Sequence, residues 1–240
     1  MQRPGIRWFP ALFLRDNKMS NAVNYDRLME EILGERGTIP QFTAAASLTL
    51  PPISVLLHSC CAPCSSACIE RLCDRCDITV YYYNPNIGDE AEYLKRKEEQ
   101  IRLIEAYNRE KKGIVPIRIL DADHDPESFY AMARGLEDCP ERGSRCHKCY
   151  ELRMRKTAMA ALEAGGFDYF ATTLTLSPLK DSEAINRIGQ RIEEETGMKY
   201  LPSDFKKRNG YLRSIELSRE YDLYRQDFCG CIYSRRLSEG

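Results

Sequence analysis

Three widely separated segments of the sequence each carry a close pair of cysteines. Thiolates at such spacings hold metal ions or iron–sulfur clusters, or exchange electrons as a dithiol and a disulfide. In the first pair the cysteines are adjacent, in the second two residues separate them, and in the third one residue does. They are Cys60 and Cys61, Cys146 and Cys149, and Cys229 and Cys231.

The first two pairs together supply four thiolates. The CHKC spacing of Cys146 and Cys149 lets two thiolates from one turn of chain bind one metal or cluster. Four thiolates complete either a zinc site or a 4Fe-4S cluster, and spacing alone does not choose between them. Structural zinc usually stabilises a small domain, whereas this chain is large enough to fold without it. The pattern therefore favours a functional cluster.

The third pair, in DFCGC, is typical of redox chemistry. With one glycine between them, Cys229 and Cys231 fall on the same face of an extended segment, and Gly230 lets the backbone tighten until the sulfurs meet. A disulfide in so small a ring is strained, which raises its reduction potential. The alternative is that both are further metal ligands.

Five more cysteines surround these pairs. Cys61 and Cys64 form CAPC, which resembles a thioredoxin-type motif, but that interpretation gives Cys60 no role and leaves the other pairs unexplained. Cys64 is near enough to assist a metal site without being needed for a set of four. We expect the remaining four to be buried or incidental thiols: Cys68, Cys139, and Cys73 with Cys76, which should lie at the opposite end of the sheet.

Composition indicates a folded intracellular protein. The 240 residues are 43% hydrophobic and 30% charged, and the net charge of −1 gives no global attraction for nucleic acid. Eleven cysteines are too unevenly spaced for a secreted disulfide scaffold. No apolar stretch approaches the roughly 20 residues of a membrane helix. We therefore expect a cytoplasmic protein with no membrane partner.

Short apolar runs alternate with helical segments from residue 53 onward. Continuous rather than alternating apolar runs indicate strands buried on both faces. The alternation predicts an α/β fold in which a Rossmann-like parallel sheet is flanked by helices. We expect strands at 53–59, 77–84, 113–120, 167–176 and 198–202, and helices at 24–35, 89–113 and 181–197.

This fold predicts where the chemistry occurs. Ligands of open α/β sheets bind outside the carboxyl ends of the strands, and Cys60 and Cys61 follow the first strand directly. Adjacent residues of an extended chain point to opposite faces, so both cysteines can serve one site only if the chain turns there. Pro63 fits such a turn. We therefore expect a metal site at the carboxyl ends of the strands.

The ends of the chain are expected to differ from the core. In residues 1–23, Pro10 interrupts a short apolar patch and no small-residue cleavage site follows, which is unlike a signal peptide. We predict a disordered extension there, with Met19 as an alternative start, and a linker at 37–52. Residues 24–240 are predicted to form a single catalytic domain with an N-terminal helix.

Basic residues flank the second cysteine pair. Arg145, Lys148 and Arg153 stand beside it, and such runs are usually solvated helix faces. Beside a redox site in a nearly neutral protein they also suit a polyanionic substrate, because phosphate contacts position a nucleic acid without reading its sequence.

Several motifs in order resemble the cobalamin-independent epoxyqueuosine reductases, the QueH family. They are LLHSCCAPCSS, YNPNI with EYLKRK, GLEDCPERGSRCHKCYELRMRKTA, FDYFATTLTLSPLKD and DFKKRNGYLRSIELSREYDLYRQDFCGC, spanning about residues 24–233. The resemblance implies a fold of the HUP (nucleotide-hydrolase-like) branch. It also implies two-electron removal of the epoxide oxygen of epoxyqueuosine at the wobble position of tRNA, the last step of queuosine biosynthesis.

The resemblance also implies roles for individual residues. Cys60, Cys61, Cys146 and Cys149 match ligands of a 4Fe-4S cluster, and Cys229 and Cys231 match a redox-active disulfide. Some relatives bind a further iron, for which Cys64, Cys229, Cys231 or Asp181 are candidate ligands. No cobalamin is implied. The partners would be epoxyqueuosine-containing tRNA and a ferredoxin- or flavodoxin-like electron donor.

The departing oxygen needs a Lewis acid or a proton. Asp181, in SPLKD after a strand, is the candidate acid, with His58 behind it. Because His58 lies within an apolar strand, a satisfied core histidine is the expected alternative.

Two other functions compete with this one. An iron–sulfur tRNA thiolase of the ATP-pyrophosphatase type requires a glycine-rich phosphate loop after the first strand, where this sequence has SCCAPCSS. A zinc-stabilised RNA-binding module would use the same thiolates without redox chemistry.

Overall fold

A parallel four-stranded sheet forms the centre of the protein. The computed structural model describes residues 23–36 and 51–235. The strand order is β3-β2-β1-β4 and every pairing is parallel, which confirms the predicted α/β class. The strands are β1 (Ile53–His58), β2 (Cys76–Tyr81), β3 (Arg118–Leu120) and β4 (Tyr169–Thr172).

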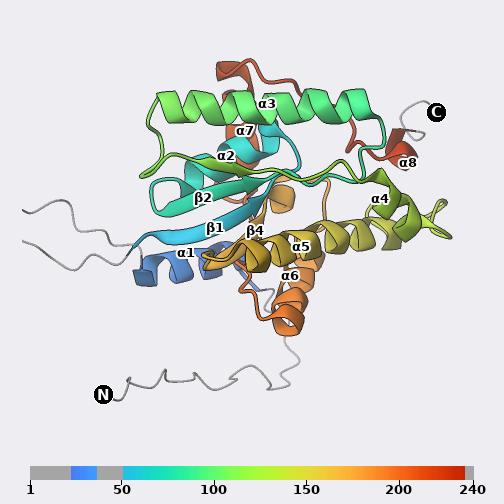
Figure 1. The fold of residues 1–240 in the computed structure, drawn as a ribbon, viewed down its shortest axis with the longest axis horizontal. Helices are drawn as coiled ribbons and strands as arrows, with labels where there is room; N and C mark the ends of the chain where they lie inside the picture. Colours follow the sequence, from blue (N-terminus) through green and yellow to red (C-terminus); the bar gives the residue numbers. More distant parts are fainter. Residues whose placement is uncertain (1–22, 37–50, 236–240) are drawn as a thin grey trace, which may run out of the picture.

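Helices cover both faces of the sheet, so the chain folds into three layers (Figure 1). One face packs against α2 (Ala62–Leu72), α3 (Glu90–Arg109) and α7 (Gly210–Glu220), and the other against α5 (Ser144–Ala164) and α6 (Ser182–Thr196). None of the described helices combines the length and the apolar character that crossing a bilayer requires. The remaining helices are α1 (Tyr25–Arg36), α4 (Pro126–Ala133) and α8 (Ile232–Arg235).

Strand β1 is buried on both faces, as its continuous apolar run predicts. Val55 and Leu57 belong to the core under α2 and α3, while Leu56 belongs to the core under α5 and α6. All three side chains are fully buried. Because β1 pairs with both β2 and β4, the end of this strand fixes where Cys60 and Cys61 leave the sheet.

Two of the predicted strands are shorter than expected. Only Arg118–Leu120 of the run 113–120 pairs with β2; Pro116, which has no N–H to donate, directly precedes Ile117 and the strand. The run 167–176 pairs as far as Thr172 and then turns into a 3-10 helix, η1 (Thr173–Leu176), which the Thr172 side chain caps by accepting a hydrogen bond from the Leu174 N–H.

The predicted strand at 198–202 is wrong. The segment contributes a single parallel bridge between Phe170 and Tyr200 and no strand. Met198, Tyr200 and Leu201 are nevertheless buried, so the apolar run reflects core packing rather than sheet pairing. A short apolar run alone does not distinguish a buried strand from a buried segment of another conformation.

The predicted helices form close to their expected bounds. Asp181 caps α6 by accepting from the Ala184 N–H, and Gly197 ends it in the left-handed region at φ +77°. Helix α3 begins at the Asp89 cap and ends at Arg109, before the lysines and Gly113 that the prediction included. The predicted extension, the Met19 start and most of the 37–52 linker lie outside the described residues.

Helix α1 is attached near the amino ends of the strands by ion pairs. Arg71 contacts Asp26 at 2.5 Å and Glu30 at 2.7 Å, and Arg75 contacts Glu30 at 2.9 Å. Met29 and Leu33, both fully buried, add apolar contact with the core. This end of the sheet is therefore held by charge pairs and packing.

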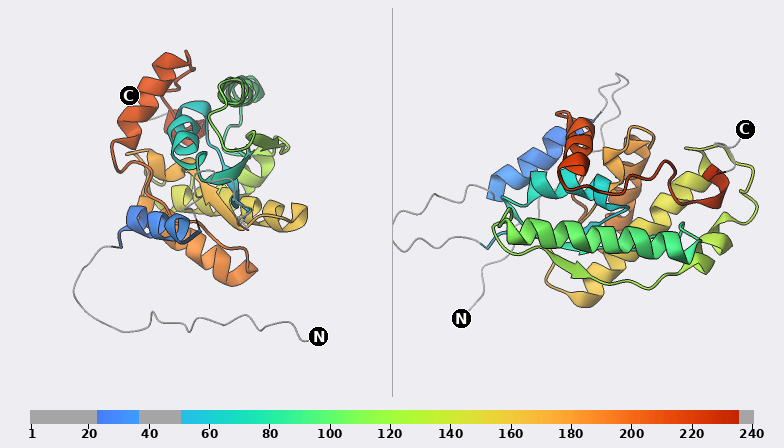
Figure 2. Two further views of the ribbon diagram at one scale, coloured as in Figure 1. Left: turned by 90° about the vertical axis from the view of Figure 1, so that its left-hand side faces the viewer. Right: turned by 90° about the horizontal axis from the view of Figure 1, so that it is seen from above.

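The opposite end gathers chain from distant parts of the sequence. Figure 2 shows α8 beside α4 and the first turns of α5, far from α1. A small apolar cluster joins them, with Phe129 and Ala133 from α4, Cys149 from α5, and Cys231 just before α8. The C-terminal cysteine pair is thus carried next to the second pair.

Candidate metal and redox centre

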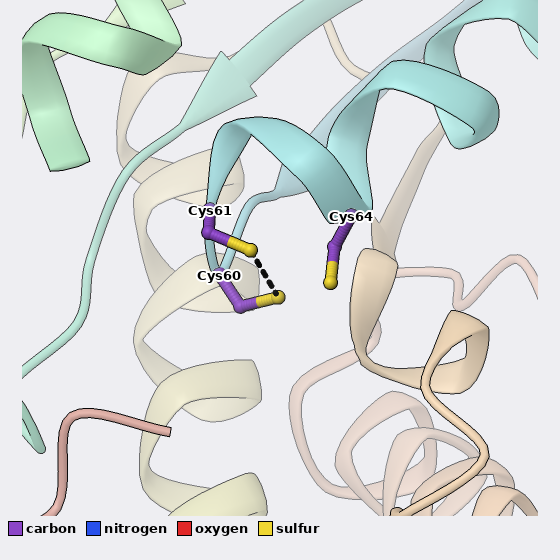
Figure 3. A group of neighbouring side chains, drawn as sticks. All are labelled: Cys60, Cys61 and Cys64. Atoms are coloured by element: carbon purple, nitrogen blue, oxygen red, sulfur yellow. Dashed lines mark hydrogen bonds between the residues drawn. The ribbon is translucent and has the colours of Figure 1, made fainter. Parts of the chain in front are cut away.

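Three sulfur atoms meet where β1 ends. The Sγ atoms of Cys60, Cys61 and Cys64 all lie within 4.8 Å of one another, and those of Cys60 and Cys61 are 3.9 Å apart (Figure 3). Across residues 23–36 and 51–235, no other three cysteine, histidine or acidic side chains bring their ligand atoms so close. Cys64, which the sequence analysis treated as dispensable, is therefore part of the group.

The turn after β1 explains how adjacent cysteines share one site. Cys61 is extended, with φ −177°, and caps α2, while Pro63 occupies the first turn of that helix. Thr173, which follows β4, holds Cys60 from the other side. Its Oγ1 accepts from the Cys60 N–H at 3.2 Å and donates to the Cys60 Sγ at 3.4 Å.

All three predicted cysteine pairs line one cavity of about 380 Å³. Its walls are formed by residues that follow β1, β2 and β4, so it lies outside the carboxyl ends of the strands. The strand order reverses between β1 and β4, which is where open parallel sheets bind ligands. Seven cysteines line the cavity: Cys60, Cys61, Cys64, Cys146, Cys149, Cys229 and Cys231.

The backbone of the CGC segment is fastened to the loop after β2. The Asn86 side chain donates to the Cys229 carbonyl at 2.8 Å, and Arg96 reaches the Phe228 carbonyl at 3.5 Å. Gly230 has φ +93°, and a Cβ there would lie 2.5 Å from Ile87. Only glycine permits this close approach, so the segment's position is set by named contacts.

The electrostatics of the trio favour one thiolate. Hydrogen bonds from Cys61 and then Cys64 hold the pKa of Cys60 well below its ordinary value, and the charge of Lys180 lowers it further. The hydrogen bond with Cys60 raises the pKa of Cys61 to about 12, and the pKa of Cys64 is also raised. Among the three, the thiolate form is therefore favoured at Cys60.

The CGC pair is polarised in the same way. A hydrogen bond from the Cys231 thiol holds the pKa of Cys229 well below its ordinary value, and the pKa of Cys231 is raised correspondingly. The Ser234 hydroxyl lies 3.2 Å from the Cys229 sulfur. Both cysteines are free thiols, with Cys229 exposed and Cys231 buried. Within the pair, Cys229 is therefore the thiol that ionises more readily and is the better nucleophile.

Lys180 is a site residue that the sequence analysis missed. It lines the cavity, and although burial opposes its charge, the negative charges of Cys60 and Cys229 raise the pKa of the ammonium. It is thus the cation shared by the two groups of cysteines. Its position in SPLKD, shortly after the predicted strand at 167–176 and next to Asp181, was the available signal.

Asp181 lies at the cap of α6 and is not among the cavity-lining residues. Its Oδ1 accepts from the Ala184 N–H at 3.0 Å, and its Oδ2 lies 3.7 Å from His147. His58 is fully buried, with Nδ1 2.9 Å from Thr172 Oγ1 and Nε2 accepting from Arg153 at 3.2 Å. Burial lowers the pKa of His58 to about 3, so it is the satisfied, neutral core histidine that we expected as the alternative.

The three predicted tRNA-binding residues differ in their surroundings. Arg145 is buried and donates to the carbonyls of Leu136 and Glu137 at 2.9 and 2.7 Å. Arg153 is buried beside His58 and Asn84. Lys148 alone is exposed. The two arginines therefore support the cavity walls, which they also line.

Comparison with known proteins identifies the family. The profile described as "Epoxyqueuosine reductase QueH" matches residues 55–237. The chain belongs to the epoxyqueuosine reductase QueH family. It is 42% identical over 217 residues to the QueH of Streptococcus pyogenes serotype M1, covering 90% of this chain and 79% of that protein. The QueH proteins of Staphylococcus epidermidis and Thermotoga maritima are 40% and 32% identical, covering 90% and 75% of this chain and 87% and 90% of those proteins.

The QueH match confirms the family that the motifs indicated. The profile spans all seven cysteines that line the cavity, along with Lys180 and the loop that holds the CGC segment. A redox function for the cavity is therefore favoured over the thiolase and the structural zinc module. The donor set also fits an iron–sulfur cofactor, because thiolates are the ligands that such clusters require.

Proposed function

We propose that this protein reduces the epoxide of epoxyqueuosine in tRNA to the alkene of queuosine in the cysteine-lined cavity. The observation that carries the proposal is the convergence of seven cysteines from three segments, with Lys180, on one cavity at the carboxyl edge of the sheet. A volume of about 380 Å³ falls in the range of small-ligand sites, so a single modified base fits it. The cytoplasm, where tRNA is modified and thiols stay reduced, is the expected compartment.

The residues present fit a metal cofactor. Cys60, Cys61, Cys146 and Cys149 would hold a 4Fe-4S cluster, which supplies electrons singly when bound. Cys64 lies with Cys60 and Cys61 and remains available to a further iron. The thiolate character of Cys60 and the nearby charges of Lys180 and Arg153 match the needs of an anionic metal–sulfur group.

The CGC pair balances the reaction. Reduction of an epoxide to an alkene consumes two electrons and two protons and releases water. Oxidation of the Cys229 and Cys231 thiols to a disulfide forms one S–S bond and releases the two electrons and two protons that the epoxide consumes. A ferredoxin- or flavodoxin-like donor would then restore the dithiol for the next turnover.

Lys180 would act on the leaving oxygen. An alkoxide leaves poorly near neutral pH, so a hydrogen bond or proton must reach the epoxide oxygen as the C–O bonds break. Lys180 lines the cavity and interacts electrostatically with Cys60 and Cys229, whereas the Asp181 carboxylate is engaged at the cap of α6. We therefore add Lys180 to Asp181 as a candidate for this role.

A charged cavity suits a tRNA substrate. Six basic side chains line it against two acidic ones, although the whole chain has a net charge of −1. A base that reacts in a pocket must leave its stack, and the phosphates on either side then stay at the rim. The basic residues are Arg96, Arg142, Arg145, Arg153, Lys180 and Arg225.

The direct test is a single turnover without an external donor. Anaerobically prepared, reduced protein is mixed with an anticodon stem-loop carrying epoxyqueuosine, and nucleosides and cysteines are analysed by mass spectrometry. The proposal predicts queuosine in step with a new Cys229–Cys231 disulfide. Formation of queuosine with both cysteines still reduced would contradict the role of the pair. Absence of queuosine even with a donor and a full cluster would contradict the function.

A further inference from the structure

An aromatic side chain of unassigned role stands beside the cavity. Tyr211, in the first turn of α7, lines the cavity and is 36% exposed. Its hydroxyl makes no hydrogen bond within the described part of the chain. Leu179, which follows η1, also lines the cavity and is 71% exposed. A single exposed apolar side chain is ordinary on a protein surface, so what sets these two apart is their place on the wall of the cavity.

The position of Tyr211 is fixed by the structure around it. Gly210 packs so tightly that a Cβ there would meet the Phe205 carbonyl at 1.9 Å, which sets the start of α7. One turn later Ser214, also lining the cavity, is 1% exposed, and its carbonyl accepts from Arg225 at 3.3 Å. Arg225 in turn donates to the Ser218 hydroxyl at 3.0 Å. The aromatic ring therefore sits on a rigid helix end.

Charge identifies the kind of partner. The exposed cations Arg142 and Arg225 line the same cavity as Tyr211, and Lys180 lies deeper in it. Exposed aromatic rings combined with cations are the pattern that binds single-stranded nucleic acid, because bases stack on the rings while phosphates contact the cations. An acidic protein partner would match the cations but give the exposed ring no specific role.

We propose that Tyr211 and Leu179 form a stacking platform for the nucleotide adjacent to the modified one. When the modified base enters the cavity it leaves its neighbour without one stacking partner. Tyr211 would replace that partner while Arg142 and Arg225 contact the adjoining phosphates. This inference rests on the proposed function and adds to it the residues that hold the RNA open.

The test uses cluster-loaded protein and an anticodon stem-loop in which 5-iodouridine replaces the nucleotide next to the modified one. We expect irradiation to cross-link this base to Tyr211. Tyr211→Leu should abolish the cross-link and weaken RNA binding about tenfold, within the range that one base–aromatic stack supplies. Tyr211→Phe keeps the ring and should bind within about twofold of the unchanged protein. KM for the RNA should follow binding, with a much smaller change in kcat.

Leu212→Ala provides the matched control. Leu212 neighbours Tyr211, is 56% exposed and does not line the cavity, so its loss should leave binding and turnover unchanged. A Tyr211→Leu protein that binds RNA as tightly as the unchanged protein would overturn the inference, as would a cross-link mapping elsewhere. Binding is measured without turnover, so failure of the platform is distinguishable from failure of the reductase function, which would appear as unchanged epoxyqueuosine in every protein.

Discussion

Two cysteine pairs with the same spacing lie at opposite ends of the sheet. Cys73 and Cys76 link α2 to β2 at the amino end, while Cys146 and Cys149 begin α5 at the carboxyl end. Burial raises the pKa of Cys73 and of Cys149 alike, each to about 11. Spacing and acidity thus fail to separate the two pairs.

Their neighbours separate them. The Cys73 thiol donates to the Lys112 carbonyl, with the sulfur 3.4 Å from the oxygen, and neither it nor Cys76 lines the cavity. Cys146 and Cys149 share a cavity with five other cysteines and with Lys180. A parallel sheet leaves its ligand crevice at the carboxyl ends only. The position of a cysteine pair relative to the strand ends therefore separates the two pairs where spacing does not.

The largest expected effect comes from exchanging one cysteine at each end. Cys149→Ser should lose most bound iron and sulfide, and turnover should fall by more than the roughly 10–100-fold that losing an outer partner of a metal ligand costs. Cys73→Ser should retain its iron and most of its activity. Metal and sulfide analysis with a turnover assay measures both. Equal iron loss in the two proteins would contradict the assignment of cluster binding to the carboxyl end alone.

A second contrast concerns neighbouring residues at the carboxyl end. Lys180→Met should lower kcat by about 10²-fold, the effect of removing a positioned group that assists the departing oxygen. Asp181→Asn keeps a good helix cap and should have a much smaller effect. Steady-state kinetics at saturating RNA, with iron content as a control, decide the matter. The reverse ranking would return the acid role to Asp181.

Thiol reactivity offers a third contrast. In reduced, metal-free protein, the lowered pKa of Cys229 makes a larger fraction of it thiolate at pH 7 than the roughly 3% of an ordinary cysteine. Its alkylation rate should therefore rise less between pH 7 and 9 than that of an ordinary cysteine. Cys73, whose pKa is raised to about 11, should react slowly and speed up with pH. Peptide mapping after timed alkylation tests this, and parallel pH profiles would contradict it.

The smallest expected effect lies at the amino end. Burial works against the charge of Glu30, but hydrogen bonds from Arg75 and Arg71 lower its pKa to about 2. Because the folded-state pKa is depressed, this contribution is present above about pH 4.5 and is lost as pH falls toward 2. Glu30→Gln should cost about 1–2 kcal/mol of unfolding free energy at pH 7, allowing for solvent screening.

Denaturant unfolding at several pH values measures that cost. The difference between Glu30→Gln and the unchanged protein should shrink as the pH is lowered below about 4.5, while iron content at pH 7 stays the same. A loss of iron in Glu30→Gln would show that the amino end is coupled to the metal centre.

Much of this architecture follows from the sequence because parallel sheets obey strict rules. Continuous apolar runs identify β1 and β2, and the first of them predicts that Cys60 and Cys61 stand at a ligand crevice. The sequence allowed Cys64 to assist this site but left its grouping with Cys60 and Cys61 open, since that depends on how sharply the chain enters α2. Charge runs were equally ambiguous, because Arg153 reads as a solvated residue until its buried partners are seen.

Other features needed three-dimensional information. A lone lysine such as Lys180 carries no periodic signal, and only the fold shows that it lines the same cavity as Cys60 and Cys229. The approach of the CGC segment to the loop after β2 joins residues more than 140 positions apart, through Asn86 and Cys229. Local sequence patterns do not encode such long-range contacts. The family resemblance indicated the roles of these cysteines, and the fold shows that they line one cavity.

The proposed reduction of epoxyqueuosine requires an iron–sulfur centre in the cavity at the carboxyl end. The most direct measurement is anaerobic preparation of the unchanged protein, Cys149→Ser and Cys73→Ser, followed by ultraviolet–visible spectra with and without dithionite and by metal analysis. We expect a broad band near ~400 nm that bleaches on reduction, with matching iron and sulfide, in the unchanged and Cys73→Ser proteins only. Zinc without a visible band in the unchanged protein, even after iron–sulfur reconstitution, would contradict it.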